Sequence, residues 1–179
     1  MDLKLIVIYR SGYTVITTCS PKNFELVKSL GATTAFDYKD PKCAEDIKAY
    51  TDNNLKFIWD CISLESSAKL CAEVIASGGT YGMLLFLKFP RDDVKQLFSL
   101  GYTAVGEAVE KGGTTFSAEK NAKNFDFMVK WIEVAEKLIA EGKIKPHPAK
   151  VDKGLEKVLE GVDLLRHDKV SGQKLVYTV

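Results

Sequence analysis

Residues 55–86 read LKFIWDCISLESSAKLCAEVIASGGTYGMLLF and contain a predicted strand, helix and second strand in succession. Residues 55–60 form a short apolar run that is typical of a buried strand. Ser63 is a preferred helix N-cap, and the residues after it predict a helix through Ala76. Ser77-Gly78-Gly79 then turns the chain into a strand at about residues 80–86. This order predicts two parallel strands joined by a helical crossover.

The alternation of strands and helices extends towards the N-terminus. β-Branched residues predict strands at residues 5–9 and 13–18, and residues 33–36 form a third short candidate. A helix is predicted from Pro21 to Leu30 and is stopped by Gly31, and Asp40-Pro41 predicts the start of a helix that runs towards Tyr50. The pattern is that of an α/β protein with a mostly parallel sheet flanked by helices.

Towards the C-terminus the periodicity first fades and then returns. Residues 88–119 predict a long irregular excursion with recurring glycines, which could border a pocket. Apolar residues from Met128 to Ile139 recur at three- and four-residue spacing and predict one face of a long helix that ends near Gly142. Residues 155–165 predict a further helix, and residues 174–179 predict a closing strand.

Composition narrows the function classes. The 179 residues suffice for one ordinary domain, and 46% hydrophobic and 27% charged residues are typical of a globular protein. A net charge of +1 speaks against nucleic-acid and membrane partners. No run is long enough to cross a bilayer and no secretory leader is recognisable, so we expect a cytoplasmic protein. The spacing of the four cysteines matches no metal motif, and we expect no metal site.

The first two predicted strands are too close together to be parallel neighbours. Only Arg10, Ser11 and Gly12 separate Tyr9 from Tyr13, whereas a parallel crossover needs about a dozen residues or more. The first strand therefore forms an antiparallel hairpin or pairs elsewhere, including with a second molecule in a homodimer. The glycine-rich turn that cradles a dinucleotide pyrophosphate is absent from this position.

The residues after the second predicted strand suit a phosphate better than a ribose hydroxyl. NAD-binding proteins place an acidic residue there, but this chain has none between Thr18 and Asn23. Ser20, Lys28 and Tyr38 offer two hydroxyl groups and a cation, which could hold the 2′-phosphate of NADPH. The alternative roles are a helix N-cap, a solvated lysine and a half-buried tyrosine.

Several motifs carry a resemblance to a known family. They are GYTVITTCSPKNF at residues 12–24, VKSLGA at 27–32, FDYK at 36–39, FIWDCIS at 57–63, GGTY at 78–81, GKIKPHP at 142–148 and SGQKLV at 171–176. Together they resemble the medium-chain dehydrogenase/reductase superfamily and, within it, the fungal trans-acting enoyl reductases of the lovastatin type that serve polyketide synthases. The resemblance covers roughly residues 3–179.

The resemblance implies a Rossmann-like cofactor domain and NADPH-dependent reduction of an enoyl group. It implies that Ser20, Lys28 and Tyr38 grip the 2′-phosphate and that Cys61 and Ile62 lie near the adenosine. Two parts of the family pattern are missing: the N-terminal, GroES-like catalytic domain, and the first βα unit with its phosphate-binding loop. Residues 1–179 are therefore expected to form a single truncated cofactor-domain unit.

These departures lead to a primary hypothesis of a repurposed fragment. Without the phosphate cradle and the second domain, hydride transfer loses both positioning and electrostatic support. We expect the vacant cleft to bind a polyketide and to promote a non-redox step such as isomerisation or a Diels–Alder-type cyclisation, with no cofactor required. The candidate wall residues are Tyr81, Met83, Phe86, Phe89 and Glu107.

Three alternatives remain open at this point. The chain could be a residual NADPH-dependent enoyl reductase that works as a dimer or with a partner synthase. It could be a non-catalytic module that binds a polyketide synthase through an uncovered surface. It could also be the product of a gene model that lacks an exon.

Overall fold

The computed structural model describes residues 11–144 and 146–179, which form two compact units. One unit contains the described residues up to Asp37 together with those from Glu141 onward. The other unit contains Tyr38–Ala140. Each unit has its own sheets, and they are described separately below.

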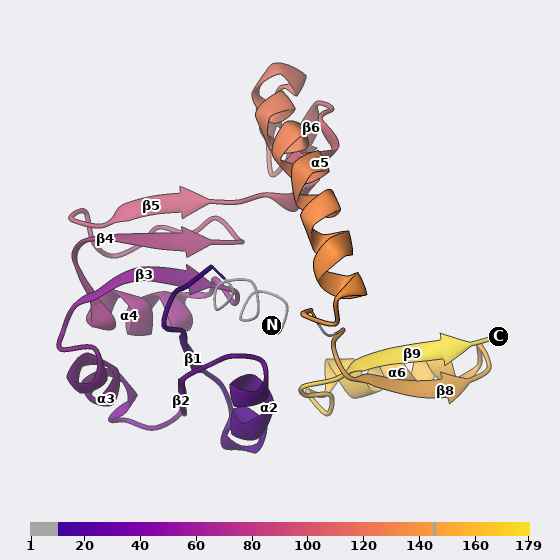
Figure 1. Cartoon of the computed structure of the whole chain (residues 1–179), viewed down its shortest axis with the longest axis horizontal. Coiled ribbons are helices and arrows are strands. Elements are labelled where there is room, and N and C mark those ends of the chain that lie inside the picture. The colour runs from indigo at the N-terminus through magenta and orange to yellow at the C-terminus, as the bar shows by residue number, and fades with distance from the viewer. Residues whose placement is uncertain (1–10, 145) are drawn as a thin grey trace. The chain divides into compact units, whose positions relative to one another are not determined.

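The larger unit, Tyr38–Ala140, is built on a parallel three-stranded sheet (Figure 1). Its order is β3 (Leu55–Asp60), β4 (Ile75–Met83) and β5 (Lys95–Phe98). The helix α4 (Glu65–Val74) connects β3 to β4 and covers one face of the sheet, as the crossover pattern predicts. A second helix, α3 (Cys43–Tyr50), precedes β3 and contacts α4.

The core of this unit lies between α4 and the sheet. Its buried side chains are Ala68, Ile75, Tyr81, Met83, Phe89 and Val94. The rings of Tyr81 and Phe89 stack with their centroids 4.0 Å apart. The apolar run that predicted a buried strand therefore supplies one layer of a two-layer α/β unit.

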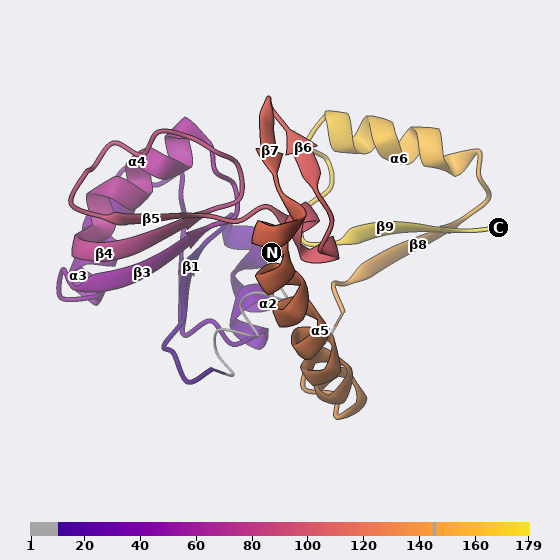
Figure 2. The same ribbon diagram turned by 90° about the horizontal axis from the view of Figure 1, so that it is seen from above.

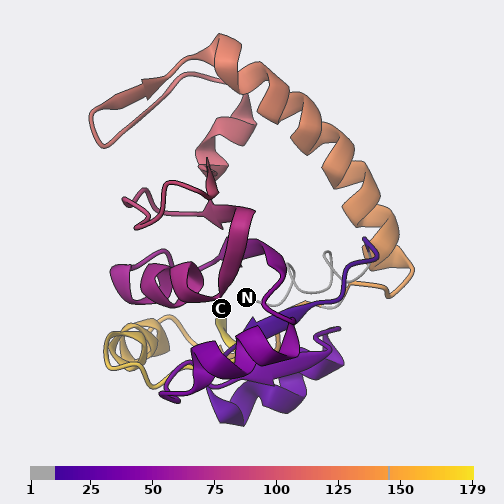
Figure 3. The same cartoon turned by 90° about the vertical axis from the view of Figure 1, so that its left-hand side faces the viewer.

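The remainder of this unit is more regular than predicted. After β5 the chain forms a 3-10 helix, η2 (Gly101–Val105), and an antiparallel hairpin of β6 (Val109–Lys111) and β7 (Thr114–Phe116). The hairpin leads into the long helix α5 (Ala118–Ala140), as Figure 3 shows. Gly112 and Gly113 both have positive φ, at 59° and 75°, which suits a two-residue hairpin turn.

The smaller unit contains two parallel strand pairs. In the first pair, β1 (Ile16–Thr18) lies beside β2 (Thr34–Phe36), joined through a 3-10 helix, η1 (Pro21–Asn23), and α2 (Phe24–Ser29). In the second, β8 (Ala149–Lys153) lies beside β9 (Lys174–Thr178), with α6 (Lys157–Arg166) running alongside them (Figure 2). The Asn23 side chain donates a hydrogen bond to Ser171 Oγ at 3.0 Å and links the two parts.

The α/β class with parallel sheets is confirmed, and most predicted elements exist in the described residues. The predicted strand at residues 5–9 lies outside them, so its re-pairing and the loss of the first βα unit stay predictions. The prediction of an irregular segment at residues 88–119 is wrong in part, because β5 and the β6–β7 hairpin occur within it. Lys95–Phe98 lacks the β-branched residues that announce a strand, so only its pairing with β4 reveals it.

Two further details differ from the predictions. The strand predicted from about residue 80 begins at Ile75, and β8 was not predicted at all. Ser63 does not cap α4; the Leu64 N–H donates instead to Ser67 Oγ at 3.0 Å. Across the residues that the structure describes, there is no helix long and apolar enough to span a membrane.

Candidate functional site

The carboxyl ends of β3, β4 and β5 meet in one row. Asp60 is paired in register with Met83, and Met83 with Phe98. Ligands of parallel α/β sheets bind outside this edge, because the strands end there and the following loops are free to vary. We therefore take the carboxyl edge, defined as Asp60, Met83, Phe98 and the residues that directly follow each of them, as the candidate site.

A buried carboxylate organises this edge. Asp60 is only 5% exposed, and its Oδ1 accepts hydrogen bonds from the backbone N–H groups of Ile62 and Ser63 at 2.9 and 2.8 Å. Its Oδ2 accepts from Ser67 Oγ at 2.7 Å and from the Tyr81 hydroxyl at 2.8 Å. Four donors thus compensate the desolvation of one carboxylate.

Ser63 connects the ends of two strands. Its hydroxyl donates to the Asp60 carbonyl at 2.9 Å and accepts from the Leu84 N–H at 2.8 Å. Ser63 is 3% exposed, and its φ of 55° lies in the left-handed region that serine rarely adopts. The loop after β3 and the loop after β4 are therefore joined through one strained serine.

The network shifts the acid–base properties of its neighbours. Burial, followed by the hydrogen bond to Asp60, raises the pKa of Tyr81 far above its usual value. Burial, with a smaller contribution from the Asp60 charge, raises the pKa of Cys71 to about 12. Both groups are neutral at physiological pH, so the Tyr81 hydroxyl keeps its proton and donates a hydrogen bond to Asp60, and Cys71 is not a thiolate nucleophile.

The residues assigned to the adenosine lie at this edge. Cys61 and Ile62 directly follow β3, and the Ile62 side chain is exposed while its N–H is held by Asp60. Asp60 and Ser63, which hold this loop, were missed as site residues. An acidic residue that ends an otherwise apolar strand is the signal that could have found the first of them.

The residues assigned to the 2′-phosphate fall in both units. Ser20 follows β1, and Lys28 lies on α2 with its Nζ 3.4 Å from a Glu25 carboxylate oxygen. Tyr38 is the first residue of the larger unit and is exposed. Ser20 follows Thr18 by two positions and Tyr38 follows Phe36 by two positions; Thr18 and Phe36 are paired in register in β1 and β2. Their role as a phosphate site stays a prediction.

The five predicted cleft residues do not come together as one wall. Tyr81, Met83 and Phe89 are core residues, exposed by 2% or less, because they face α4. Phe86 is 81% exposed and makes an edge contact with Phe98, their ring centroids 5.9 Å apart. Glu107 is exposed in a separate loop, where its carbonyl accepts a hydrogen bond from Asn121. Their assignment as ligand contacts stays a prediction.

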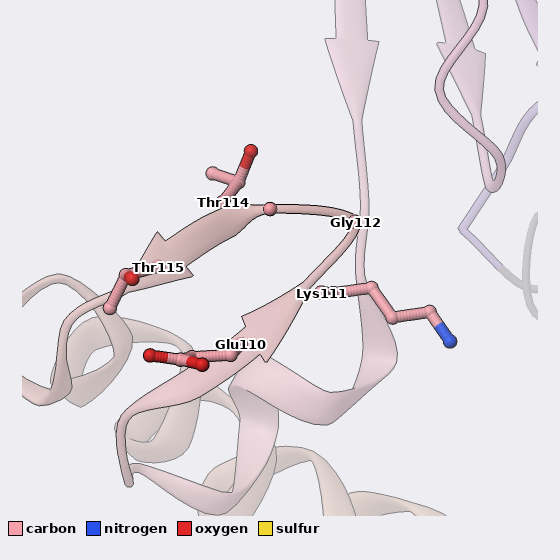
Figure 4. Close-up of a pocket in the computed structure, with 6 residues that line it drawn as sticks. Glu110, Lys111, Gly112, Thr114 and Thr115 are labelled. Atoms are coloured by element: carbon pink, nitrogen blue, oxygen red, sulfur yellow. The ribbon is translucent and has the colours of Figure 1, made fainter.

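Other polar features do not resemble a site. An open hollow is lined by residues 110–115 of the hairpin, but the Glu110 and Lys111 side chains point to opposite sides of it (Figure 4). Lys111 lies instead over the Tyr102 ring, 5.6 Å from its centroid. Among the described side chains, no three His, Cys, Asp or Glu residues gather as metal ligands would. The expected absence of a metal is not tested by this structure.

Comparison with protein families identifies the chain. The family described as zinc-binding dehydrogenase matches residues 9–112, which is more than half of the sequence. The chain belongs to this family. The zinc-binding dehydrogenases are medium-chain dehydrogenases/reductases (MDR), so the resemblance drawn from the motifs is confirmed.

The curated relatives of the chain include fungal trans-enoyl reductases. A trans-enoyl reductase of Fusarium heterosporum is 41% identical over 94% of this chain and 49% of its own length. One from Pyricularia oryzae is 37% identical over 100% of this chain and 51% of its own length. A dual trans-enoyl reductase/FAD-dependent monooxygenase of Aspergillus terreus is 46% identical over 85% of this chain and 22% of its own length. The chain thus spans about half, or less, of the length of these relatives.

Solved structures show the same fold at low sequence identity. The JamJ enoyl reductase, in its apo form, aligns with 97% of this chain and 50% of its own, with a TM-score of 0.70 and 15% identity. The CurF ER cyclopropanase from the curacin A biosynthetic pathway aligns with 97% of this chain and 50% of its own, with a TM-score of 0.68 and 19% identity. The MDR chain therefore shares the fold of about half of each of these solved chains.

Proposed function

We propose that this chain contributes the NADPH-binding half of a trans-acting enoyl reductase in fungal polyketide biosynthesis. The support is the carboxyl edge of β3, β4 and β5, built around Asp60, in a chain that aligns over 94–100% of its length with trans-enoyl reductases. NADPH supplies the hydride that reduces a carbon–carbon double bond conjugated to a carbonyl group. The protein's part is to hold the cofactor and orient it.

The donors available at the predicted phosphate site fit this cofactor. Ser20 is half-buried, and no hydrogen bond from its side chain caps η1, so its hydroxyl is not committed to the helix that follows. Lys28 is exposed and its contact with Glu25 is long, so its ammonium group can turn to a phosphate. No carboxylate occupies the residues between Thr18 and Asn23, where one would repel a 2′-phosphate.

Calorimetric titration with NADPH and with NADH tests this proposal. We expect NADPH to bind more tightly, because only NADPH carries the 2′-phosphate. Lys28→Ala should weaken NADPH binding about tenfold and leave NADH binding unchanged, whereas the exposed Lys69→Ala on α4 should change neither. Equal affinities for both nucleotides, or no binding of either, would refute the proposal.

A second candidate function rests on the exposed aromatic pair. Phe98 lies at the carboxyl edge, and Phe86, three residues beyond the end of β4, contacts its ring; the pair offers an apolar contact to a polyketide. We keep the hypothesis that the chain binds a polyketide there and promotes a cyclisation or isomerisation without a cofactor, by restraining its conformation. The expected result is conversion of a linear polyene thioester to an isomeric product in the absence of NADPH.

A matched pair of variants separates this candidate from non-specific binding. Phe86→Ala should slow the conversion at least about fivefold, since the ring supplies contact area at the edge. Phe127→Ala, which removes another exposed ring from α5, should leave the rate unchanged. No isomeric product from the wild-type protein would eliminate this candidate.

The remaining partner and location assignments are also proposals. A non-catalytic module should co-purify with a polyketide synthase while its deletion leaves the product unchanged. A homodimer should sediment at twice the monomer mass of 19.8 kDa. A cytoplasmic location should be visible with a fluorescent fusion.

A further inference from the structure

The loops after β3 and β4 are held together by a single side chain. We use the name Ser63 bridge for the two hydrogen bonds of the Ser63 hydroxyl, to the Asp60 carbonyl at 2.9 Å and from the Leu84 N–H at 2.8 Å. Leu84 is the first residue beyond β4. On the β3 side the bridge joins Asp60, the last residue of β3, to Ser63, and Cys61 and Ile62 lie between them. The bridge therefore spans the candidate ligand edge from one strand end to the next.

The backbone of Ser63 is held in a costly conformation. A φ of 55° brings the Cβ of a non-glycine residue close to the backbone, and asparagine, aspartate and glycine are the usual occupants of this region. Such strain persists where surrounding contacts over-determine the conformation, and it clusters at functional sites. Here the contacts are visible: the Asp60 carboxylate accepts from the N–H groups of both Ile62 and Ser63.

A glycine would satisfy the backbone of this turn without strain, but it would have no hydroxyl group. The side chain is therefore the part of Ser63 that the backbone geometry does not require. Its two hydrogen bonds do not extend either strand, since Ser63 lies outside β3 and Leu84 outside β4. They set the separation of two loops that would face a ligand.

We propose that Ser63 is a positioning residue, whose hydroxyl holds the Cys61–Ile62 backbone and the start of the loop after β4 at the spacing that the cofactor requires. This inference rests on the proposed NADPH-binding function. Asp60 supports it by fixing the Ser63 backbone from the buried side. Ser63 is assigned no contact with the reacting atoms.

Two substitutions separate positioning from stability. Ser63→Ala and Ser63→Gly both remove the bridge, but only Ser63→Gly also relieves the left-handed strain. We expect Ser63→Gly to unfold at a higher urea concentration than Ser63→Ala, while both weaken NADPH binding about tenfold. Thr51→Ala is the matched control, because it removes a hydroxyl bond to the Ile47 carbonyl at the end of α3, before β3 begins.

Amide hydrogen exchange measures the bridge without any ligand. In the ligand-free protein, exchange of the Leu84 N–H should accelerate about tenfold in both Ser63 variants and stay unchanged in Thr51→Ala. Unchanged Leu84 exchange in the Ser63 variants would overturn the bridge itself. If NADPH affinity follows stability, so that Ser63→Gly binds like the wild type, the residue is structural and the positioning role is wrong.

The two proposals can fail separately. If the wild-type protein binds no NADPH, the proposed function fails, and so does the cofactor-positioning role of Ser63. Accelerated Leu84 exchange in the variants would in that case still establish that the bridge joins the two loops. If NADPH binds the wild type and both Ser63 variants equally, only the positioning inference is overturned.

Discussion

At the residue scale, Asp60 shows how a charge is accommodated in a small core. Its two carboxylate oxygens receive two backbone and two hydroxyl donors, so the hydration lost on burial is replaced. Because each donor comes from a different residue, the carboxylate joins β3, the loop after it, α4 and β4. Loss of its acceptor capacity should therefore affect the whole α4 side of the sheet.

Asp60→Asn should destabilise the protein by about 3 kcal/mol, because an amide NH₂ would replace one oxygen and face a donor without an acceptor. Urea unfolding followed by far-ultraviolet circular dichroism measures this loss. Asp52→Asn is the control, since Asp52 is exposed and asparagine tolerates its φ of 49°. A loss below about 0.5 kcal/mol would contradict the bonding scheme.

The Cys71 thiol should react slowly in the native protein. With a pKa of about 12, caused first by burial, it carries almost no thiolate at pH 8. Iodoacetamide labelling followed by mass spectrometry should modify Cys71 only after urea is added. Rapid labelling of Cys71 in the native protein would show that α4 opens readily or that the thiol is not buried.

At the element scale, hydrogen bonds from Arg91 hold the end of α4, and close packing of Trp59 on Gly82 holds β3 against β4. Arg91 donates from Nη1 to the carbonyls of Ala72 and Ile75, at 3.0 and 2.7 Å, and so satisfies acceptors at the end of α4. Asp93 holds the same guanidinium from its other side. In the sheet, Gly82 lies directly under the Trp59 ring, which leaves no room for a side chain.

Acid should weaken the Arg91–Asp93 contact in a defined pH window. The hydrogen bond from Arg91 lowers the pKa of Asp93 from 3.8 to about 2. Because the folded pKa is the lower one, the stabilisation is complete above about pH 4 and is lost as the pH falls towards 2. Comparing urea midpoints of wild type and Asp93→Asn should show a difference at pH 5 that shrinks below pH 3. A constant difference would contradict this assignment.

Gly82→Ala should destabilise the sheet by about 2 kcal/mol, since the new methyl group would overlap the Trp59 ring. The displaced ring should enter water and shift its fluorescence emission to longer wavelength. The double variant Trp59→Ala with Gly82→Ala isolates the clash, because alanine at position 82 should cost much less once the ring is gone. An equal cost in both backgrounds would show that the strain lies elsewhere.

At the scale of the whole molecule, two units share one chain. The smaller unit combines segments that the entire larger unit separates, and among its described residues one buried cluster consists of Val15, Cys19, Val27 and Ala32. The prediction of one domain over residues 1–179 implies that the two units unfold together in one cooperative transition.

Differential scanning calorimetry should show a single transition, with equal calorimetric and van't Hoff enthalpies. The reason is that the smaller unit is assembled from two distant chain segments, so its ordering depends on the larger unit that connects them. Two separate transitions would mean that the units unfold independently and would contradict the one-domain expectation. A destabilised Val27→Ala variant helps to assign the transitions, because Val27 belongs to the smaller unit.

Much of the fold was predictable because its signals are local. The apolar run at residues 55–60 became β3 with the predicted bounds, and Gly31 and Gly142 have the positive φ expected at helix ends. β5 and β8 were not predicted, since Lys95–Phe98 and Ala149–Lys153 lack a clear strand pattern and exist through pairing with β4 and β9. Elements that depend on a distant partner carry little signal of their own.

The sequence by itself determined the α/β class and the family, because periodicity, turn residues and motifs are contained in short segments. Only the tertiary structure decided that Tyr81, Met83 and Phe89 face α4 and that Asp60 and Ser63 organise the carboxyl edge. Ser63 and Leu84 are 21 positions apart and Asp60 and Tyr81 are equally distant, so register between parallel strands brings them together. Strand register is a property of the packed sheet, and no single segment contains it.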